Sequence, residues 1–245
     1  MVVMKSVNSD VAYAHIRKRI LNGEYPPNHA LTTKELSKEI GVSRTPVRDA
    51  LRQLETDGLV SIRPRLGASV KAMNLTEFRE MCGLRLALES YAAGLAAQHR
   101  TEADLLEIRF ALENMRRLTE EIVTEEDEPR LLGELIREDV RFHIAIMMAA
   151  KSDLLKKEIL RLHLINRVVS GTGGSSPIAD LHERAARRRV VLNSHEEIFR
   201  ALESGDTPAA KNAMDRHIQD IIDMNVRTMS RMARELTEDE LSYTT

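Results

Sequence analysis

Four side chains of the kinds that bind divalent cations stand at helical spacing in the second half of the chain. Asp139 and His143 are four residues apart, so a helix places them on one face, between apolar neighbours. His195 and His217 lie in two later helical stretches, each close to apolar residues. Three helices are therefore expected to direct metal-binding atoms into the interior of a bundle.

A divalent transition metal explains this set better than burial without one. One carboxylate and three imidazoles are costly to bury unpaired, whereas a cation binds all four in their deprotonated forms. We predict a tetrahedral or octahedral site for zinc, nickel or manganese, with zinc as the first choice. For any single histidine a hydrogen-bonded core position would be the commoner explanation, and it is the joint pattern that favours a metal.

Two other functions of such a site stay open. One aspartate and three histidines that leave coordination positions free could activate water, as in a metal-dependent hydrolase. The sequence offers no evident additional general base for that reaction. Alternatively, the metal is purely structural, and the helical part of the chain serves only dimerisation.

Helices must position these ligands, and the sequence from Thr76 onward has helical periodicity without a strand pattern. After a first long helix, further helices are predicted at residues 102–124, 129–150, 153–169, 178–204 and 208–235. We therefore expect an antiparallel bundle of six or seven helices, with any ligand site between facing helices.

A second stretch that could do chemistry lies near the N-terminus, where basic residues recur once per helical turn. Arg48 and Arg52 share one face of a helix that starts near Thr45, and Arg44 stands at its start. Ser43 or Thr45 can cap this helix, and a proline suits its first position. The opposite face is apolar and comprises Val47, Ala50, Leu51 and Leu54.

The segments around this helix predict a winged helix-turn-helix. A short helical pattern at residues 33–40 precedes it, and Gly41 supplies the turn between the two. Two strands follow at residues 59–62 and 68–70, joined by the basic turn at 63–67. The expected fold is mainly α, with an N-terminal winged helix-turn-helix of α/β type and a C-terminal all-α antiparallel bundle.

Both parts resemble one family of proteins. The N-terminal part resembles the signature of the GntR family of bacterial transcriptional regulators, through the run Ile-Gly-Val-Ser-Arg-Thr-Pro-Val-Arg at residues 40–48 and Leu-Glu-Thr-Asp-Gly-Leu-Val at 54–60. The helical part resembles the ligand-sensing domain of the FCD branch, where an Asp-x3-His pair and two later histidines hold a metal. All four of these positions are occupied here.

The resemblance implies a DNA-binding transcriptional regulator, with a repressor as the first choice and no enzymatic activity. The operator contacts that it implies are Lys34, Arg44, Thr45, Arg48, Arg52, Arg63 and Gly67. Arginines can bond guanine in the major groove, Thr45 and Lys34 suit phosphate, and the wing suits the minor groove. A homodimer is expected because one recognition helix reads too few bases.

The resemblance also implies an effector. Arg85 and Glu89 match an Arg-x3-Glu pattern in which the arginine can grip an effector carboxylate through two hydrogen bonds. The alternative for this pair is an ion pair within one helix. Asn166 is a second effector-binding candidate. A small organic or sugar acid could complete the coordination of the metal and contact Arg85.

The charge distribution divides the chain in the same place. Residues 1–71 hold 12 lysines and arginines against 7 acidic residues, and the remainder holds 24 against 31. We place a DNA-binding domain at residues 1–73 and a metal-binding, effector-binding and dimerisation domain at 74–245. The single cysteine fits a reducing compartment, and no apolar run approaches the ~20 residues of a membrane helix. A cytoplasmic protein without membrane contact is expected.

Overall fold

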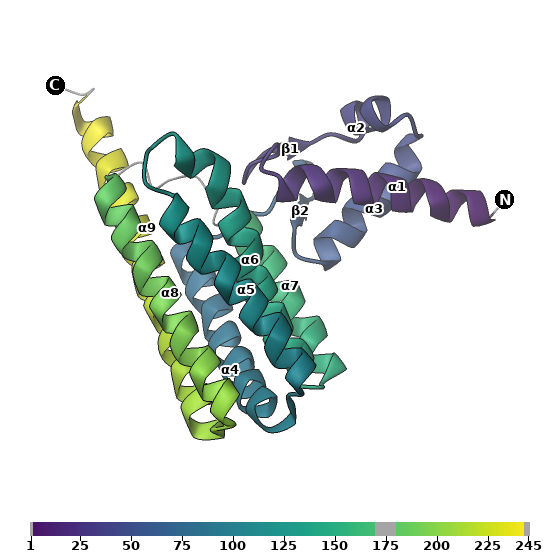
Figure 1. Cartoon of the computed structure of the whole chain (residues 1–245). Helices are drawn as coiled ribbons and strands as arrows, with labels where there is room; N and C mark the ends of the chain where they lie inside the picture. Colours follow the sequence, from purple (N-terminus) through teal and green to yellow (C-terminus); the bar gives the residue numbers. More distant parts are fainter. Residues whose placement is uncertain (1, 170–179, 243–245) are drawn as a thin grey trace. The chain divides into compact units, whose positions relative to one another are not determined.

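The computed structural model describes residues 2–169 and 180–242 (Figure 1). Within these residues the chain forms nine helices and three short strands. It divides into two compact units. The first unit comprises the N-terminal residues through Met73 together with the end of a later helix, from Arg161 onward. The second unit begins at Asn74 and contains the remaining helices.

The N-terminal unit is a winged helix-turn-helix, as predicted. Its strands form an antiparallel sheet in the order β1-β3-β2, in which Arg63 faces Gly67 at the closed end of the wing. The elements are α1 (Val2–Leu21), β1 (Ala30–Leu31), α2 (Thr33–Ile40), α3 (Arg44–Thr56), β2 (Val60–Arg63) and β3 (Gly67–Val70). The strand β1 was not expected from the sequence, because two residues carry no periodicity.

Local residue choices explain the helix-turn-helix. The Thr32 side chain accepts a hydrogen bond from the Glu35 amide at the start of α2, and Gly41 ends this helix with a φ of 76°. The predicted side-chain cap on α3 is wrong: Ser43 holds the cap position but makes no such bond. Pro46 is the third helical residue, not the first, and it has no amide hydrogen to offer Ser43.

The second unit is built on helices that run side by side, with α4 next to α9, α5 next to α6, and α8 next to α9 (Figure 1). The predicted all-α bundle is therefore confirmed, with six helices and no strand in the part of this region that the structure describes. The elements are α4 (Leu75–His99), α5 (Glu102–Glu121), α6 (Asp127–Ala149), α7 (Asp153–Val169), α8 (Leu181–Ser204) and α9 (Thr207–Ser242).

Two helices end three or more residues away from the predicted C-terminal residue. Helix α5 ends at Glu121, before the predicted residue 124, because Thr124 takes part in starting the next helix. The Thr124 hydroxyl accepts a hydrogen bond from the Asp127 amide, and the Asp127 carboxylate accepts one from the Thr124 amide. Helix α9 continues to Ser242, past the predicted residue 235, since no glycine or proline interrupts it.

Small residues on α4 let the helices of the bundle approach closely. Ala92, Ala93, Ala96 and Ala97 are buried in a core that continues through apolar side chains of α5, α6, α8 and α9. This core surrounds the three predicted histidine ligands, which are buried as well. None of the helices in the described residues is both long enough and apolar enough to cross a membrane.

Candidate metal centre and DNA-binding surface

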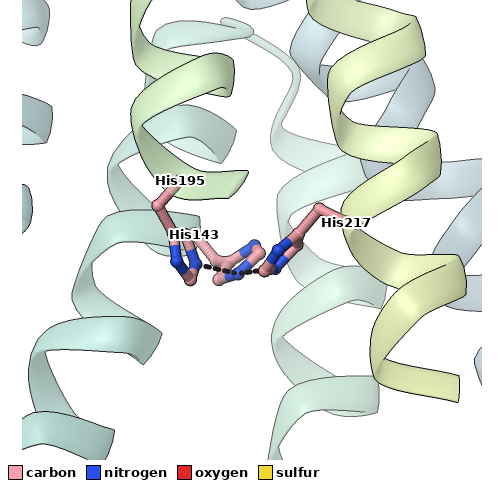
Figure 2. Close-up of side chains that lie close together, drawn as sticks. All are labelled: His143, His195 and His217. Carbon is pink, nitrogen blue, oxygen red and sulfur yellow. Dashed lines mark hydrogen bonds between the residues drawn. The ribbon is translucent and has the colours of Figure 1, made fainter. Parts of the chain in front are cut away.

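The three predicted histidine ligands converge at one point in the bundle. His143 on α6, His195 on α8 and His217 on α9 point their rings toward one another (Figure 2). The Nε2 atoms of His195 and His217 each lie 3.3 Å from Nε2 of His143. Oδ1 of Asp139 lies 3.3 Å from Nε2 of His195. The three histidines are thus brought together, and Asp139 adjoins them through His195.

The hydrogen bonds on the far side of two rings determine where their protons sit. Nδ1 of His195 lies 2.8 Å from the Val191 carbonyl oxygen, which can only accept, so this nitrogen carries the proton. The Ser194 hydroxyl donates to the same carbonyl at 2.7 Å and therefore accepts from Nδ1 of His217, also at 2.7 Å. Nε2 of both neutral rings is left with a lone pair that faces the centre.

Two charged side chains of α4 lie next to the His143 ring and determine which of its nitrogens carries the proton. Oε2 of Glu89 lies 2.9 Å from Nδ1 of His143, and Oε1 of Glu89 accepts a 2.7 Å bond from Nε of Arg85. All three side chains are buried. The carboxylate favours the proton on Nδ1, so Nε2 of His143 also presents a lone pair to the centre. Sequence reasoning paired Arg85 with Glu89 but gave no indication that Glu89 contacts His143.

The electrostatics favour the metal-binding protonation states of His217 and Asp139. Burial lowers the pKa of His217 well below its usual value, and the neighbouring His195 and His143 lower it further. Burial alone would raise the pKa of Asp139, but the hydrogen bond to His195 and the electrostatic interaction with the nearby imidazoles hold it below its usual range. Neutral imidazoles and an ionised carboxylate are the forms that coordinate metals.

The donor set and its spacing fit zinc. Zinc sites take nitrogen and oxygen ligands at about 2.0–2.1 Å in tetrahedral geometry, which separates neighbouring donor atoms by about 3.3–3.4 Å. The nitrogen pairs at 3.3 Å agree with that spacing. Three lone pairs directed at one buried point would repel each other without a cation between them. The residues present therefore fit a divalent metal.

A cavity of about 320 Å³ adjoins this site and exposes 34 % of the Asp139 side chain. Its walls are mostly apolar, and two arginines of α8, Arg187 and Arg188, also line it. Sequence reasoning missed both arginines, although Arg188 stands two helical turns before His195. Arg85 is not among the described residues that line the cavity, and direct contact between Arg85 and an effector stays a prediction. The side chain of Asn166 lies outside the described residues.

The predicted DNA-contacting residues lie at the surface of the winged helix-turn-helix. All seven are exposed: Lys34, Arg44, Thr45, Arg48, Arg52, Arg63 and Gly67. Arg48, Arg52 and Gly67 line a shared groove of about 420 Å³ between α3 and the wing. Among the described residues, the three arginines of α3 have no acidic partner. Their positive charge is therefore available to a polyanion.

Comparison with known proteins places both units in one family. Residues 8–70 match the model of bacterial regulatory proteins of the gntR family, and residues 80–220 match the FCD domain. The chain is 30 % identical to the HTH-type transcriptional regulator LutR of Bacillus subtilis, over 84 % of this chain and 95 % of LutR. It is 29 % identical to the HTH-type transcriptional repressor RspR of Escherichia coli, over 88 % and 87 %.

A solved structure has the same fold. E. coli McbR/YncC superposes with a TM-score of 0.69 and 20 % identity, over 91 % of this chain and 98 % of that one. The family consists of transcriptional regulators, so the alternative of a metal-dependent hydrolase is set aside. The chain belongs to the GntR family of DNA-binding bacterial transcriptional regulators, and its helical part is an FCD domain.

Proposed function

We propose that this regulator binds a divalent metal through Asp139, His143, His195 and His217, with zinc as the preferred ion. The observation that carries the proposal is the convergence of three buried Nε2 atoms, each on a ring whose Nδ1 atom lies within 2.9 Å of an oxygen that can accept a hydrogen bond. When bound, the metal supplies a Lewis-acidic point that attracts a carboxylate. The protein's own side chains orient the ligands.

The effector is a small organic or sugar acid that enters the cavity beside Asp139. The apolar walls of this cavity match a carbon skeleton, and the metal site at its edge matches an acidic group. To alter DNA binding, the acid must bind one arrangement of the protein more tightly than another. The helices that carry the ligands are the elements that such binding would bias.

The operator contacts proposed for the winged helix-turn-helix follow from exposure and charge. Arg44, Arg48 and Arg52 on α3 suit major-groove bases and phosphates, and the wing from Arg63 to Gly67 suits the minor groove. Lys34 and Thr45 suit phosphate. Two copies of the chain, arranged as a homodimer, would read two half-sites on one face of the duplex. Domain limits of 1–73 and 74–245 remain our assignment.

Repression is the direction of control that we propose. The support is that RspR, which this chain resembles over most of its length, bears the name of a repressor. A regulator acts in the compartment that holds the DNA, so we propose a cytoplasmic location. The operator sequence and the regulated genes are questions for genetics.

A thermal-shift screen of full-length protein tests the metal and effector together. Small organic and sugar acids are added to metal-free protein and to protein loaded with zinc. We expect zinc to raise the melting temperature and at least one acid to raise it further only when zinc is present. His195→Ala should abolish both shifts. Stabilisation by zinc without any response to acids would favour a purely structural metal, and equal shifts in His195→Ala would refute the site.

A further inference from the structure

Arg188 is a buried cation whose hydrogen-bonding groups are only partly used. Its side chain on α8 is 9 % exposed, and Nη1 donates to the Glu128 carboxylate. Nε and Nη2 are buried and have no hydrogen-bond partner among the described residues. Because an unsatisfied buried donor is costly, something with acceptor atoms is needed there to compensate.

The charge of Arg188 is incompletely neutralised. Glu128 is 2 % exposed and is shared, because Nε of Arg184 also donates to it at 2.7 Å. Arg184 additionally reaches Glu125, whose side chain is 73 % exposed. One buried carboxylate therefore serves two guanidinium groups, which leaves Arg188 able to attract a second anion.

Arg188 shares one cavity with Asp139, which among the described residues is the only predicted ligand that lines it. Asp139 and Arg188 both line the space of about 320 Å³, and apolar side chains such as Leu135 and Val191 lie along it. On α8, Arg188 precedes His195 by seven residues, which is about 10 Å along a helix axis. An elongated molecule can therefore contact the metal with one end and Arg188 with the other.

We propose that the effector carries two acidic groups, and that Arg188 binds the second of them. One carboxylate would bind at the metal, the carbon chain would lie against the apolar walls, and the far carboxylate would accept hydrogen bonds from the guanidinium group of Arg188. This inference rests on the proposed effector site. It adds that the cavity selects dicarboxylic over monocarboxylic acids and that Arg188 determines this selectivity.

Calorimetric titration of full-length, zinc-loaded protein tests the proposal. The probes are succinate, glutarate and adipate, each compared with the monocarboxylate of the same carbon number: butyrate, valerate and hexanoate. We expect at least one diacid to bind about tenfold or more tightly than its monoacid, as a buried charge-assisted contact allows. Arg188→Gln should remove that preference by lowering the affinity for the diacid to that for its monoacid.

Arg200→Gln is the matched control, because it removes an exposed arginine of the same helix that does not line the cavity. It should keep the diacid preference. Arg188→Lys, which retains the charge with fewer donors, should show an intermediate preference, and the zinc content of every variant reports folding.

The outcomes separate this inference from the proposed effector site. Monoacid binding to wild-type protein without a diacid preference, or a preference that survives Arg188→Gln, would overturn the role of Arg188 alone. Failure of every acid to bind zinc-loaded protein would overturn both proposals.

Discussion

At the scale of single residues, orientation of the histidines matters as much as their presence. Each imidazole has its Nδ1 atom against an acceptor: the Val191 carbonyl, the Ser194 hydroxyl or the Glu89 carboxylate. Such outer contacts select the tautomer that offers Nε2 to a metal and hold the ring in place. Arg85 contributes indirectly, since its bond to Glu89 holds that carboxylate in position and balances its charge.

Glu89→Gln should therefore weaken zinc binding although Glu89 is not a predicted ligand. Loss of the carboxylate removes the preference for a proton on Nδ1 of His143, and loss of an outer partner typically costs about 10–100-fold in metal affinity. Competition between the protein and a chelator of known affinity measures this change. Glu80→Gln, at an exposed position on the same helix, should bind zinc as the wild type does. Equal affinity in both variants would contradict a positioning role.

Acidification should release the metal and destabilise the metal-free protein. The pKa of His217 is lowered in the folded chain, so this imidazole is neutral there, while in the unfolded chain it gains a proton below about pH 6.5. Protonation thus favours the unfolded state as the pH falls. The lowered pKa of Asp139 acts in the same direction at more acidic pH. Melting temperatures between pH 8 and pH 5 check this, and constant stability across that range would contradict it.

Much of the metal site could be predicted from residue types, and its surroundings could not. Asp139 and His143 share a helical face by spacing alone, and apolar neighbours indicated that His195 and His217 turn inward. Helical periodicity does not give the rotation of one helix against another, so it could not reveal the Glu89 contact or the place of Arg188 in the cavity. The role of the Val191 carbonyl was also out of reach, because every residue carries the same backbone group.

At the scale of elements, α3 has an apolar face that packs in the core and an opposite face of arginines, the contact face, which is proposed to contact DNA. Val47, Ala50, Leu51 and Leu54 are buried, while the arginines of the opposite face are exposed. This division follows from helical spacing and was predictable. The position of Pro46 was mispredicted by two residues, because Arg44 already belongs to the helix. Sequence patterns identify a helix more reliably than its first residue.

Replacement of Arg48 tests the contact face of α3. We expect Arg48→Ala to weaken operator binding by about 1–3 kcal/mol and to relax the preference at one base position, because an arginine can bond O6 and N7 of guanine together. Gel-shift titration at fixed salt measures both effects. Arg200→Ala, at an exposed position on α8, serves as the control and should leave binding unchanged. An Arg48 variant that binds like the control would remove this residue from the interface.

At the scale of the whole molecule, the two units differ in charge and in the chemistry that they offer. The basic N-terminal part presents exposed arginines, and the acidic remainder encloses a cluster of histidines that could hold a metal. The first suits a polyanion, whose binding weakens as salt rises. The interior of the helical bundle suits a bound cation and a small acid.

The central claim is that the bundle holds a metal through four identified side chains. Calorimetric titration of metal-free, full-length protein with zinc tests it most directly, beside the variants Asp139→Asn, His143→Ala, His195→Ala and His217→Ala. We predict one zinc ion per wild-type chain and strongly weakened binding in every variant. Wild-type protein that takes up no zinc, or variants that bind it as tightly as the wild type, would contradict the claim.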